Sequence, residues 1–328
     1  MRQRLAPVCA ITFLLAVAGC GLEPPNRTDY RQDMRDFVQA ISTYAKEINP
    51  EFAVVPQNGC ELVSSTGEET GVPNQAYLGA IDAIGREDLF YGYDADNHPT
   101  PVGERRYMQS FLDTALAHGI TILITDYCSS PSYVDDSYTQ NAGAGYVSFA
   151  ADHRGLDDIP AYPAAPFREN SDSIGSIDQA KNFLYILDPS SFGSKQAYLD
   201  AMRATSFDCL IIDLFFEEVQ LTVQEVASLK IKRKGGTRQV LCYMSIGEAE
   251  SYRYYWRSDW KPGNPGFLDN ENPDWAGNYK VRYWETQWQQ IIFGDNQSYL
   301  KRVLDAGFDG VYLDIIDAFE YFEEEYGE

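Results

Sequence analysis

Basic residues are scarce in this chain. Twenty-six lysines and arginines stand against 49 aspartates and glutamates among 328 residues, so the formal net charge is −23. A protein with this balance repels a phosphate backbone, which excludes nucleic acid as a partner. Glycine (25) and proline (16) are near ordinary usage and 44% of residues are hydrophobic, which together predict a globular chain with a large core.

Residues that hold metals and nucleotide cofactors are also few. The three histidines, His98, His118 and His153, lie far apart in the sequence, and no CxxC spacing occurs among the six cysteines. A structural zinc site is therefore not expected. No GxGxxG follows any expected strand, so we predict no nucleotide cofactor and no metal.

The first twenty residues have the features of an export signal. Arg2 and Arg4 precede an apolar stretch at residues 8–17, which is too short to span a bilayer. The segment ends in Val17-Ala18-Gly19-Cys20, which matches a bacterial lipobox. We therefore expect a signal peptide at residues 1–19, acylation of Cys20, and a tether at 20–30 that holds the protein at the cell envelope, facing the periplasm or the exterior. An ordinary secretory peptide cut nearby is the alternative.

Four cysteines remain after this signal, namely Cys60, Cys128, Cys209 and Cys242. An exported protein permits two disulfides, and four cysteines allow three connectivities. Cys209 and Cys242 fall within apolar strand-like runs, where a buried free thiol is the commoner state. The disulfide state stays open at this point.

Apolar runs typical of buried strands alternate along the chain with segments of helical spacing. The expected strands are residues 52–56, 88–93, 120–125, 146–150, 183–187, 208–212, 240–244 and 310–313. The expected helices are residues 31–48, 75–84, 104–117, 133–144, 195–203, 223–230 and 284–306, and residues 252–283 are expected to be an aromatic loop. Eight such units predict an α/β fold, a (β/α)8 TIM barrel. A doubly wound open sheet is the alternative.

Acidic side chains recur where the expected strands end. They are Asp126, Asp152, Asp188, Asp213, Glu248 and Asp314, with Asn58, Glu61, Asp94 and Asp317 close to the same position. In a barrel, these ends converge on the face where active sites are built. Any one of these acids can equally be solvated or cap a helix. Together they predict a bowl of carboxylates, and a pair of carboxylates is what glycoside hydrolysis requires.

Two motifs carry a resemblance to a known family. Residues 243–256 contain Tyr243, then Ser-Ile-Gly-Glu-Ala-Glu, then Tyr252, Arg253 and Trp256, and residues 307–314 read Gly-Phe-Asp-Gly-Val-Tyr-Leu-Asp. Both resemble a bacterial barrel family related to the endo-α-1,4-polygalactosaminidases, which are glycoside hydrolases. Segments 56–59, 85–92 and 124–128 resemble the same family, so the likeness extends over nearly the whole chain after the signal.

The order of these segments differs from the family. The segment that resembles the start of the family's barrel lies at residues 181–183, and one from near its end lies at 159–163. The resemblance therefore implies one circularly permuted barrel at residues 31–328, opened after the usual fourth strand. Residues 31–156 would be the usual second half, 157–180 a linker, and 181–328 the usual first half.

The resemblance also implies catalytic residues. It places one carboxylate at the end of the fourth strand, which is Asp314 here, and a glutamate after the sixth. We expect that sixth strand at 88–93, and no glutamate stands at the family's position after it. Either Asp94 or Glu248 therefore takes the role of the second acid, or hydrolysis is lost. We rank Glu248 first and expect Asp213 to tune the pKa of either acid.

We predict a surface-tethered, monomeric glycoside hydrolase that cleaves an amino-sugar polysaccharide, such as a cationic galactosaminan attracted by the negative charge. Substrate contacts are expected from a further set of residues, namely Tyr243, Asp126, Asp94, Asn58, Asp317, Tyr252, Arg253 and Trp256. For the aromatic members, packing in the core or a lid is the alternative. A non-catalytic carbohydrate-binding lipoprotein with the same barrel is the second hypothesis for the whole protein.

Overall fold

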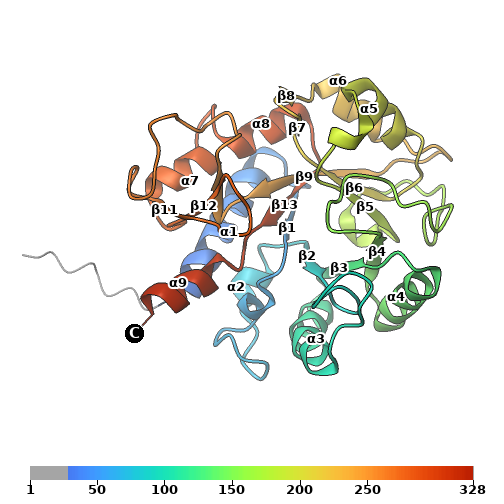
Figure 1. Ribbon diagram of the computed structural model, residues 1–328, viewed down its shortest axis with the longest axis horizontal. Helices are drawn as coiled ribbons and strands as arrows, with labels where there is room; N and C mark the ends of the chain where they lie inside the picture. The colour runs from blue at the N-terminus through green and yellow to red at the C-terminus, as the bar shows by residue number, and fades with distance from the viewer. Residues whose placement is uncertain (1–28, 328) are drawn as a thin grey trace, which may run out of the picture.

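The strands at the centre of the molecule pair in parallel (Figure 1). The computed structural model describes residues 29–327. Its five-stranded sheet has the order β1 (Ala53–Pro56), β13 (Gly310–Asp314), β9 (Gln239–Ser245), β6 (Cys209–Ile212) and β5 (Phe183–Ile186). A second sheet has the order β2 (Ala83–Glu87), β3 (Thr121–Tyr127) and β4 (Val147–Ala151). Every ladder within these two sheets is parallel.

The two sheets are neighbours along both of their edges. A parallel bridge between Gln57 and Gly85 joins the end of β1 to β2. At the other edges β4 and β5 lie against each other, although no ladder joins them in the described part of the chain. Figure 1 shows helices α3, α4 and α5 outside these strands. The protein is therefore a mixed α/β protein with parallel sheets.

The first and last of the central strands pair with each other, as a single permuted barrel at residues 31–328 requires. Ala53 is in register with Gly310 and Pro56 with Leu313, although these residues lie at opposite ends of the chain. The two ends of the described chain also meet, because the Arg31 guanidinium forms a 2.8 Å ion pair with Glu323. These contacts join the first helix to the last.

Nine α-helices are present in residues 29–327. They are α1 (Tyr30–Ile48), α2 (Gln75–Leu78), α3 (Val102–Ala117), α4 (Pro131–Ala144), α5 (Lys195–Arg203), α6 (Val223–Leu229), α7 (Thr286–Ile292), α8 (Tyr299–Ala306) and α9 (Ala318–Tyr326). Helix α1 shows why the pattern folds this way: Met34, Phe37 and Ile41 recur at helical spacing and are all buried. The Asp29 side chain accepts a hydrogen bond from the Gln32 amide and caps its N-terminus.

The expected helix at 75–84 and the expected strand at 88–93 are both wrong. The helix is the single turn α2, and the strand is β2, which occupies residues 83–87. This strand contains Gly85, Arg86 and Glu87 and so lacks the apolar run on which the prediction relied. Glycine is required at 85 because a Cβ there would lie 2.0 Å from the Tyr312 hydroxyl oxygen.

The expected aromatic loop at 252–283 contains strands. A small antiparallel sheet has the order β10 (Glu248–Glu250), β12 (Asn278–Val281) and β11 (Leu268–Glu271). A hairpin of β7 (Phe215–Phe216) and β8 (Val219–Gln220) follows β6. The expected helix at 284–306 is two helices, α7 and α8, separated by residues 293–298.

Two further expectations concern the linker and the cysteines. The structure has no strand in residues 157–180, and a short 3-10 helix, Ile177–Gln179, precedes β5. The four cysteines whose disulfide state the sequence left open are free and buried, namely Cys60, Cys128, Cys209 and Cys242. In the part of the chain from 29 to 327, no helix is long and apolar enough to cross a membrane. The predicted signal peptide and Cys20 lie outside the described residues.

Candidate active site

Asp314 is the last residue of β13 and lies where several strands end. The Tyr243 hydroxyl, from the neighbouring strand β9, donates a 2.7 Å hydrogen bond to Oδ2 of Asp314. Burial, followed by the charge of Glu87, raises the pKa of Asp314 to about 8, although the Tyr243 hydrogen bond opposes this shift. At neutral pH the carboxyl group therefore holds a proton that it can give to a bound molecule.

Glu87 is the last residue of β2 and is a site residue that the sequence prediction missed. Its Oε2 accepts hydrogen bonds from the side-chain amides of Gln57, at 2.6 Å, and Asn58, at 3.0 Å. Its Oε1 accepts a hydrogen bond from the Tyr127 hydroxyl. Three donors are thus directed at the oxygens of one carboxyl group, which accept all three hydrogen bonds. They also fix the position of Glu87, which lies close enough to Asp314 to raise its pKa.

Side-chain alternation along the strands explains how these two acids come together. Gly85 and Glu87 are two residues apart on β2, and Tyr312 and Asp314 are two residues apart on β13, so each pair shares one face. The Tyr312 hydroxyl lies directly against Gly85. The Tyr185 ring packs 5.2 Å from the Tyr312 ring, between centroids. Buried tyrosines thus pack beneath the two carboxylates.

More charged side chains surround this pair. Burial raises the pKa of Asp317 to about 6, while the charges of Arg86 and Lys280 act in the opposite direction. Partial desolvation and the charge of Asp317 raise the pKa of Glu320, an exposed residue on α9, to about 7. Several acids that resist ionisation in one place favour a cationic partner, because a positive charge would relieve their mutual repulsion.

Backbone strain accompanies the site. Ile315 follows Asp314 with a φ of 58°, and Asn58 follows β1 with a φ of 62°. For a β-branched residue such as isoleucine, this left-handed conformation is a genuine outlier that costs on the order of 1–3 kcal/mol. Gly247 packs against this turn, since a Cβ there would lie 2.2 Å from the Ile315 carbonyl oxygen. The glycine of the sequence motif is thus required by the turn that carries Asp314.

Glu248, ranked first as the second catalytic acid, lies in β10 and is 0% exposed. Its Oε1 forms a 2.6 Å ion pair with Lys280 and accepts a 2.8 Å hydrogen bond from the Asn272 side chain. Oε2 has no hydrogen-bond partner among residues 29–327. These contacts place Glu248 inside the small antiparallel sheet.

Asp213 follows β6 and is bound by Arg253. The guanidinium donates to both Asp213 oxygens, at 2.9 and 2.7 Å, and its Nε donates to Glu250 at 2.6 Å. The Tyr252 hydroxyl donates to Glu250 as well, at 2.6 Å. Bidentate Arg–carboxylate pairs of this kind hold geometry firmly. The motif residues therefore form a network around the buried Arg253 that fixes the loop after β9.

The other predicted substrate contacts divide into two groups. Asn58, Asp317 and Tyr243 lie at the site with Glu87 and Asp314. The rest lie elsewhere: Asp126 is fully buried, Asp94 is on an exposed loop, and Tyr252, Arg253 and Trp256 belong to the motif loop.

Asp126 contributes to the site indirectly. Its Oδ1 accepts hydrogen bonds from the Phe90 and Tyr91 amides, and its Oδ2 accepts from Ser137 and Asn141. These bonds hold the segment that follows Glu87.

Asp152, His153 and Asp158 form the one cluster in residues 29–327 with donor atoms close enough to hold a metal. The Gly155 amide donates to His153 Nδ1 at 3.1 Å, and His153 Nε2 lies 3.1 Å from Asp157. With Nδ1 accepting, Nε2 carries the proton and donates to the carboxylate. The cluster is partly exposed and is explained by these hydrogen bonds, so we assign no metal to it.

Comparison with known proteins identifies the family. Residues 165–327 match the model of glycoside-hydrolase family GH114. The chain belongs to this family. GH114 is the family of the endo-α-1,4-polygalactosaminidases, which confirms the resemblance seen in the sequence motifs. The GH114 match contains β5, β6, β9 and β13 and so includes Asp314, whereas Glu87 lies in the half of the chain before it.

Three uncharacterized proteins are similar to part of this chain. A Methanocaldococcus jannaschii protein is 37% identical over 47% of this chain and 43% of its own length. A Deinococcus radiodurans protein is 41% identical over 39% of each chain. A Thermotoga maritima protein is 40% identical over 38% of this chain and 37% of its own. The GH114 chain thus spans less than half the length of the curated relatives it matches.

Proposed function

We propose that this GH114 protein hydrolyses glycosidic bonds with Asp314 and Glu87 as its carboxylate pair. The observation that carries the proposal is the contrast between the two acids. Burial and the charge of Glu87 raise the pKa of Asp314 to about 8. Glu87 itself is held by three hydrogen-bond donors. A carboxyl group that keeps its proton beside a second carboxyl group fixed by three donors has the arrangement of an acid–base pair.

The roles follow from protonation. Asp314, which keeps its proton at neutral pH, donates it to the oxygen of the leaving sugar. Glu87, fixed by Gln57, Asn58 and Tyr127, acts on the opposite side of the bond as base or nucleophile. Tyr243 positions Asp314 through its hydrogen bond.

The substrate is an amino-sugar polysaccharide with free amino groups, as in a partly deacetylated galactosaminan. Asp317 and Glu320 stand beside the catalytic pair with raised pKa values, and an ammonium group would stabilise their ionised forms. The net charge of −23 draws a cationic polymer toward the protein over longer distances. We propose that it acts as a monomer.

We further propose that the eight parallel strands form one closed (β/α)8 barrel. The pairing of β1 with β13, the bridge between β1 and β2, and the packing of β4 against β5 support closure. Closure removes sheet edges, which are liable to aggregate. The GH114 match to the second half of the chain supports a permuted order opened after the usual fourth strand, with residues 157–180 as the linker.

Membrane tethering is a separate proposal that depends on Val17-Ala18-Gly19-Cys20. Acylation of Cys20 would place the protein in the bacterial cell envelope. Cys20→Ala should then release it from membranes into the soluble fraction. A wild-type protein that is soluble and unacylated by mass spectrometry would disprove the tether without affecting the enzyme proposal.

Incubation of the full chain with a panel of amino-sugar polymers tests the enzymatic function. Partly deacetylated galactosaminan should release new reducing ends, and Asp314→Asn should release none above background. If wild-type protein binds the polymer in a pull-down but releases no reducing ends, the second hypothesis, a non-catalytic carbohydrate-binding lipoprotein, replaces this one.

A further inference from the structure

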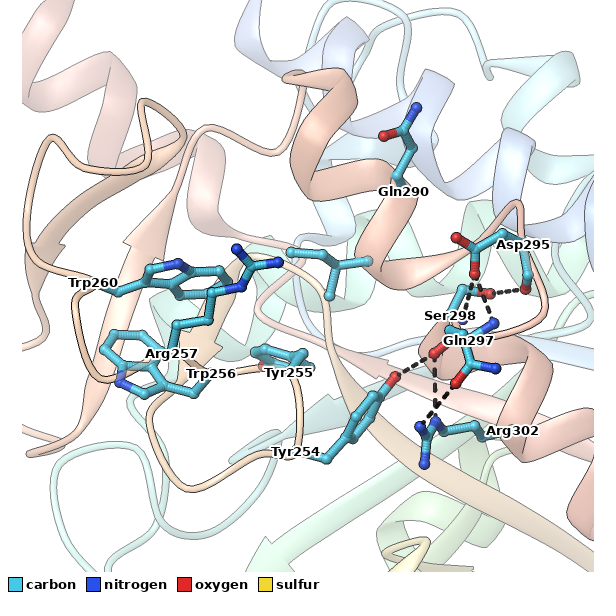
Figure 2. Close-up of a pocket in the computed structure, with 11 residues that line it drawn as sticks. Tyr254, Tyr255, Trp256, Arg257, Trp260, Gln290, Asp295, Gln297, Ser298 and Arg302 are labelled. Atoms are coloured by element: carbon cyan, nitrogen blue, oxygen red, sulfur yellow. Dashed lines mark hydrogen bonds between the residues drawn. The ribbon is translucent and has the colours of Figure 1, made fainter.

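A second cavity lies apart from the catalytic carboxylates. It measures about 460 Å³ and opens between the loop at 254–260 and the segment that joins α7 to α8 (Figure 2). None of its lining residues belongs to the set that surrounds Asp314 and Glu87. The mechanism proposed above makes no use of it.

Aromatic rings form one wall of this cavity. Figure 2 shows Tyr254, Trp256 and Trp260 on the same loop. The Trp256 and Trp260 rings meet edge to face with centroids 5.2 Å apart, and both are half-buried. Tyr254 is 37% exposed. Partly exposed aromatic surface of this kind packs against the C–H bonds of a pyranose ring, because both surfaces are apolar and flat.

The opposite wall is polar and is tied to the aromatic loop. Oδ1 of Asp295 accepts hydrogen bonds from the backbone amides of Gln297 and Ser298, at 2.7 and 2.8 Å. The Tyr254 hydroxyl donates to the Gln297 carbonyl oxygen at 3.0 Å, and the Arg302 guanidinium lies 3.8 Å from the centre of the Tyr254 ring. These contacts fix the distance between the two walls.

Two polar groups of the cavity are free to bind a ligand. Within residues 29–327, the Arg257 guanidinium and the Gln290 amide have neither an ion pair nor a hydrogen bond, and both residues are exposed. The lining contains two arginines and one carboxylate, Asp295, which makes it locally cationic on an acidic protein. A ligand with an ammonium group would meet like charge here.

We propose that this cavity is an accessory binding site for an uncharged N-acetylated hexosamine unit. The inference rests on the proposed amino-sugar substrate and assigns the acetylated units of a partly acetylated polymer to a site of their own. The ring packs on Trp256 and Trp260, while the acetamido carbonyl accepts from Arg257 and the Gln290 amide completes the hydrogen bonding. The catalytic site, lined by acids, takes the deacetylated units.

Calorimetric titration of the full chain in the Asp314→Asn background tests this site without cleavage. The probes are a short N-acetylgalactosamine oligomer and its fully de-N-acetylated counterpart. We expect Arg257→Glu and Trp260→Ala each to raise the Kd for the acetylated oligomer by about tenfold, which corresponds to roughly 1.4 kcal/mol. Arg106→Glu, which changes an exposed arginine on α3, should leave the Kd for the acetylated oligomer unchanged.

Trp260 packs 5.3 Å from the Phe267 ring, so its replacement can disturb the loop. Arg257 is exposed and its variant avoids that difficulty. Unchanged affinity in Arg257→Glu, or no binding of the acetylated oligomer by the parent chain, overturns the proposal. If no polymer is hydrolysed by wild-type protein but Arg257→Glu still weakens binding of the acetylated oligomer, the accessory site stands and the hydrolase proposal fails.

Discussion

The hydroxyl of Tyr243 donates a 2.7 Å hydrogen bond to Oδ2 of Asp314, across the parallel ladder between β9 and β13. Tyr312 and Tyr243 are in register on these strands, and Asp314 is in register with Ser245. Tyr243 is therefore two residues before the position on β9 that lies opposite Asp314, and its hydroxyl reaches that carboxylate. This contact links the first residue of the family motif to the acid at the end of the last strand.

Loss of either carboxylate should abolish hydrolysis. Asp314→Asn and Glu87→Gln are each expected to lower kcat by about 10²-fold or more, since each removes a proton donor or acceptor while keeping its shape. Reducing-end assays on a deacetylated galactosaminan measure the change, with circular dichroism to show that the fold is retained. Asp94→Asn, in an exposed loop, is the control. A greater loss in Asp94→Asn than in Glu87→Gln would return the second acid to Asp94.

Tyr243→Phe should change the pH profile. The hydrogen bond from Tyr243 lowers the pKa of Asp314, so its removal raises that pKa further above its ordinary value. Because Asp314 must be protonated to act as the acid, the alkaline limb of kcat/KM is expected to move to higher pH. Tyr162→Phe is the control, because its exposed hydroxyl donates to Asp135 and not to a residue of the site. An alkaline limb that shifts equally in both variants would contradict this assignment.

The sequence was sufficient to predict strands wherever burial on both faces produces an apolar run. The ladder between β1 and β13 followed from two such runs at opposite ends of the chain. Strand β2 could not be recognised in this way, because packing against Tyr312 demands a glycine at 85 and the site demands Glu87. Among the parallel strands of the two main sheets, β2 is therefore the one that the pattern placed wrongly.

The candidate site was predicted in part for the same reason. Asp314 follows an apolar strand, and the family resemblance selected it from the acids at the strand ends. Glu248 has a more distinctive sequence context than Glu87, but that context reflects its ion pair with Lys280 and the network around Arg253. A distinctive motif can thus serve packing as well as catalysis, and sequence alone does not separate these two roles. The glutamate in the Gly-Arg-Glu-Asp segment at 85–88 was visible, and the correct strand boundary would have identified it.

Asp314 should destabilise the folded protein as pH rises. Its pKa is about 8 in the folded state, against about 3.9 for an unfolded aspartate. The folded state therefore binds this proton more tightly, and stability is lost as the pH rises from about 4 to about 8. Asp314→Asn cannot ionise, so its free energy of unfolding relative to wild type should increase across this window and then level off. Urea denaturation at a series of pH values measures this, with Asp94→Asn as the exposed control. A difference that is constant with pH would contradict the raised pKa.

The buried ion pair of Lys232 and Asp208 should be essential for folding stability. Both side chains are 0% exposed and their charged atoms lie 2.8 Å apart. Asp208 also accepts hydrogen bonds from the Asn170 side chain and the Lys181 amide, both at 2.9 Å, so it anchors the segment that leads into β5.

Lys232→Met would leave the Asp208 carboxylate buried without its cation, which typically costs about 3–5 kcal/mol. Lys234→Met is the matched control. Lys234 is 60% exposed and pairs with Glu169 at the surface, where an ion pair contributes about 0–1 kcal/mol. Urea denaturation of both variants at neutral pH should therefore show a large fall in the free energy of unfolding for Lys232→Met and little change for Lys234→Met. Equal effects would mean that burial of the pair does not determine its contribution, and that the segment before β5 is held by its other contacts.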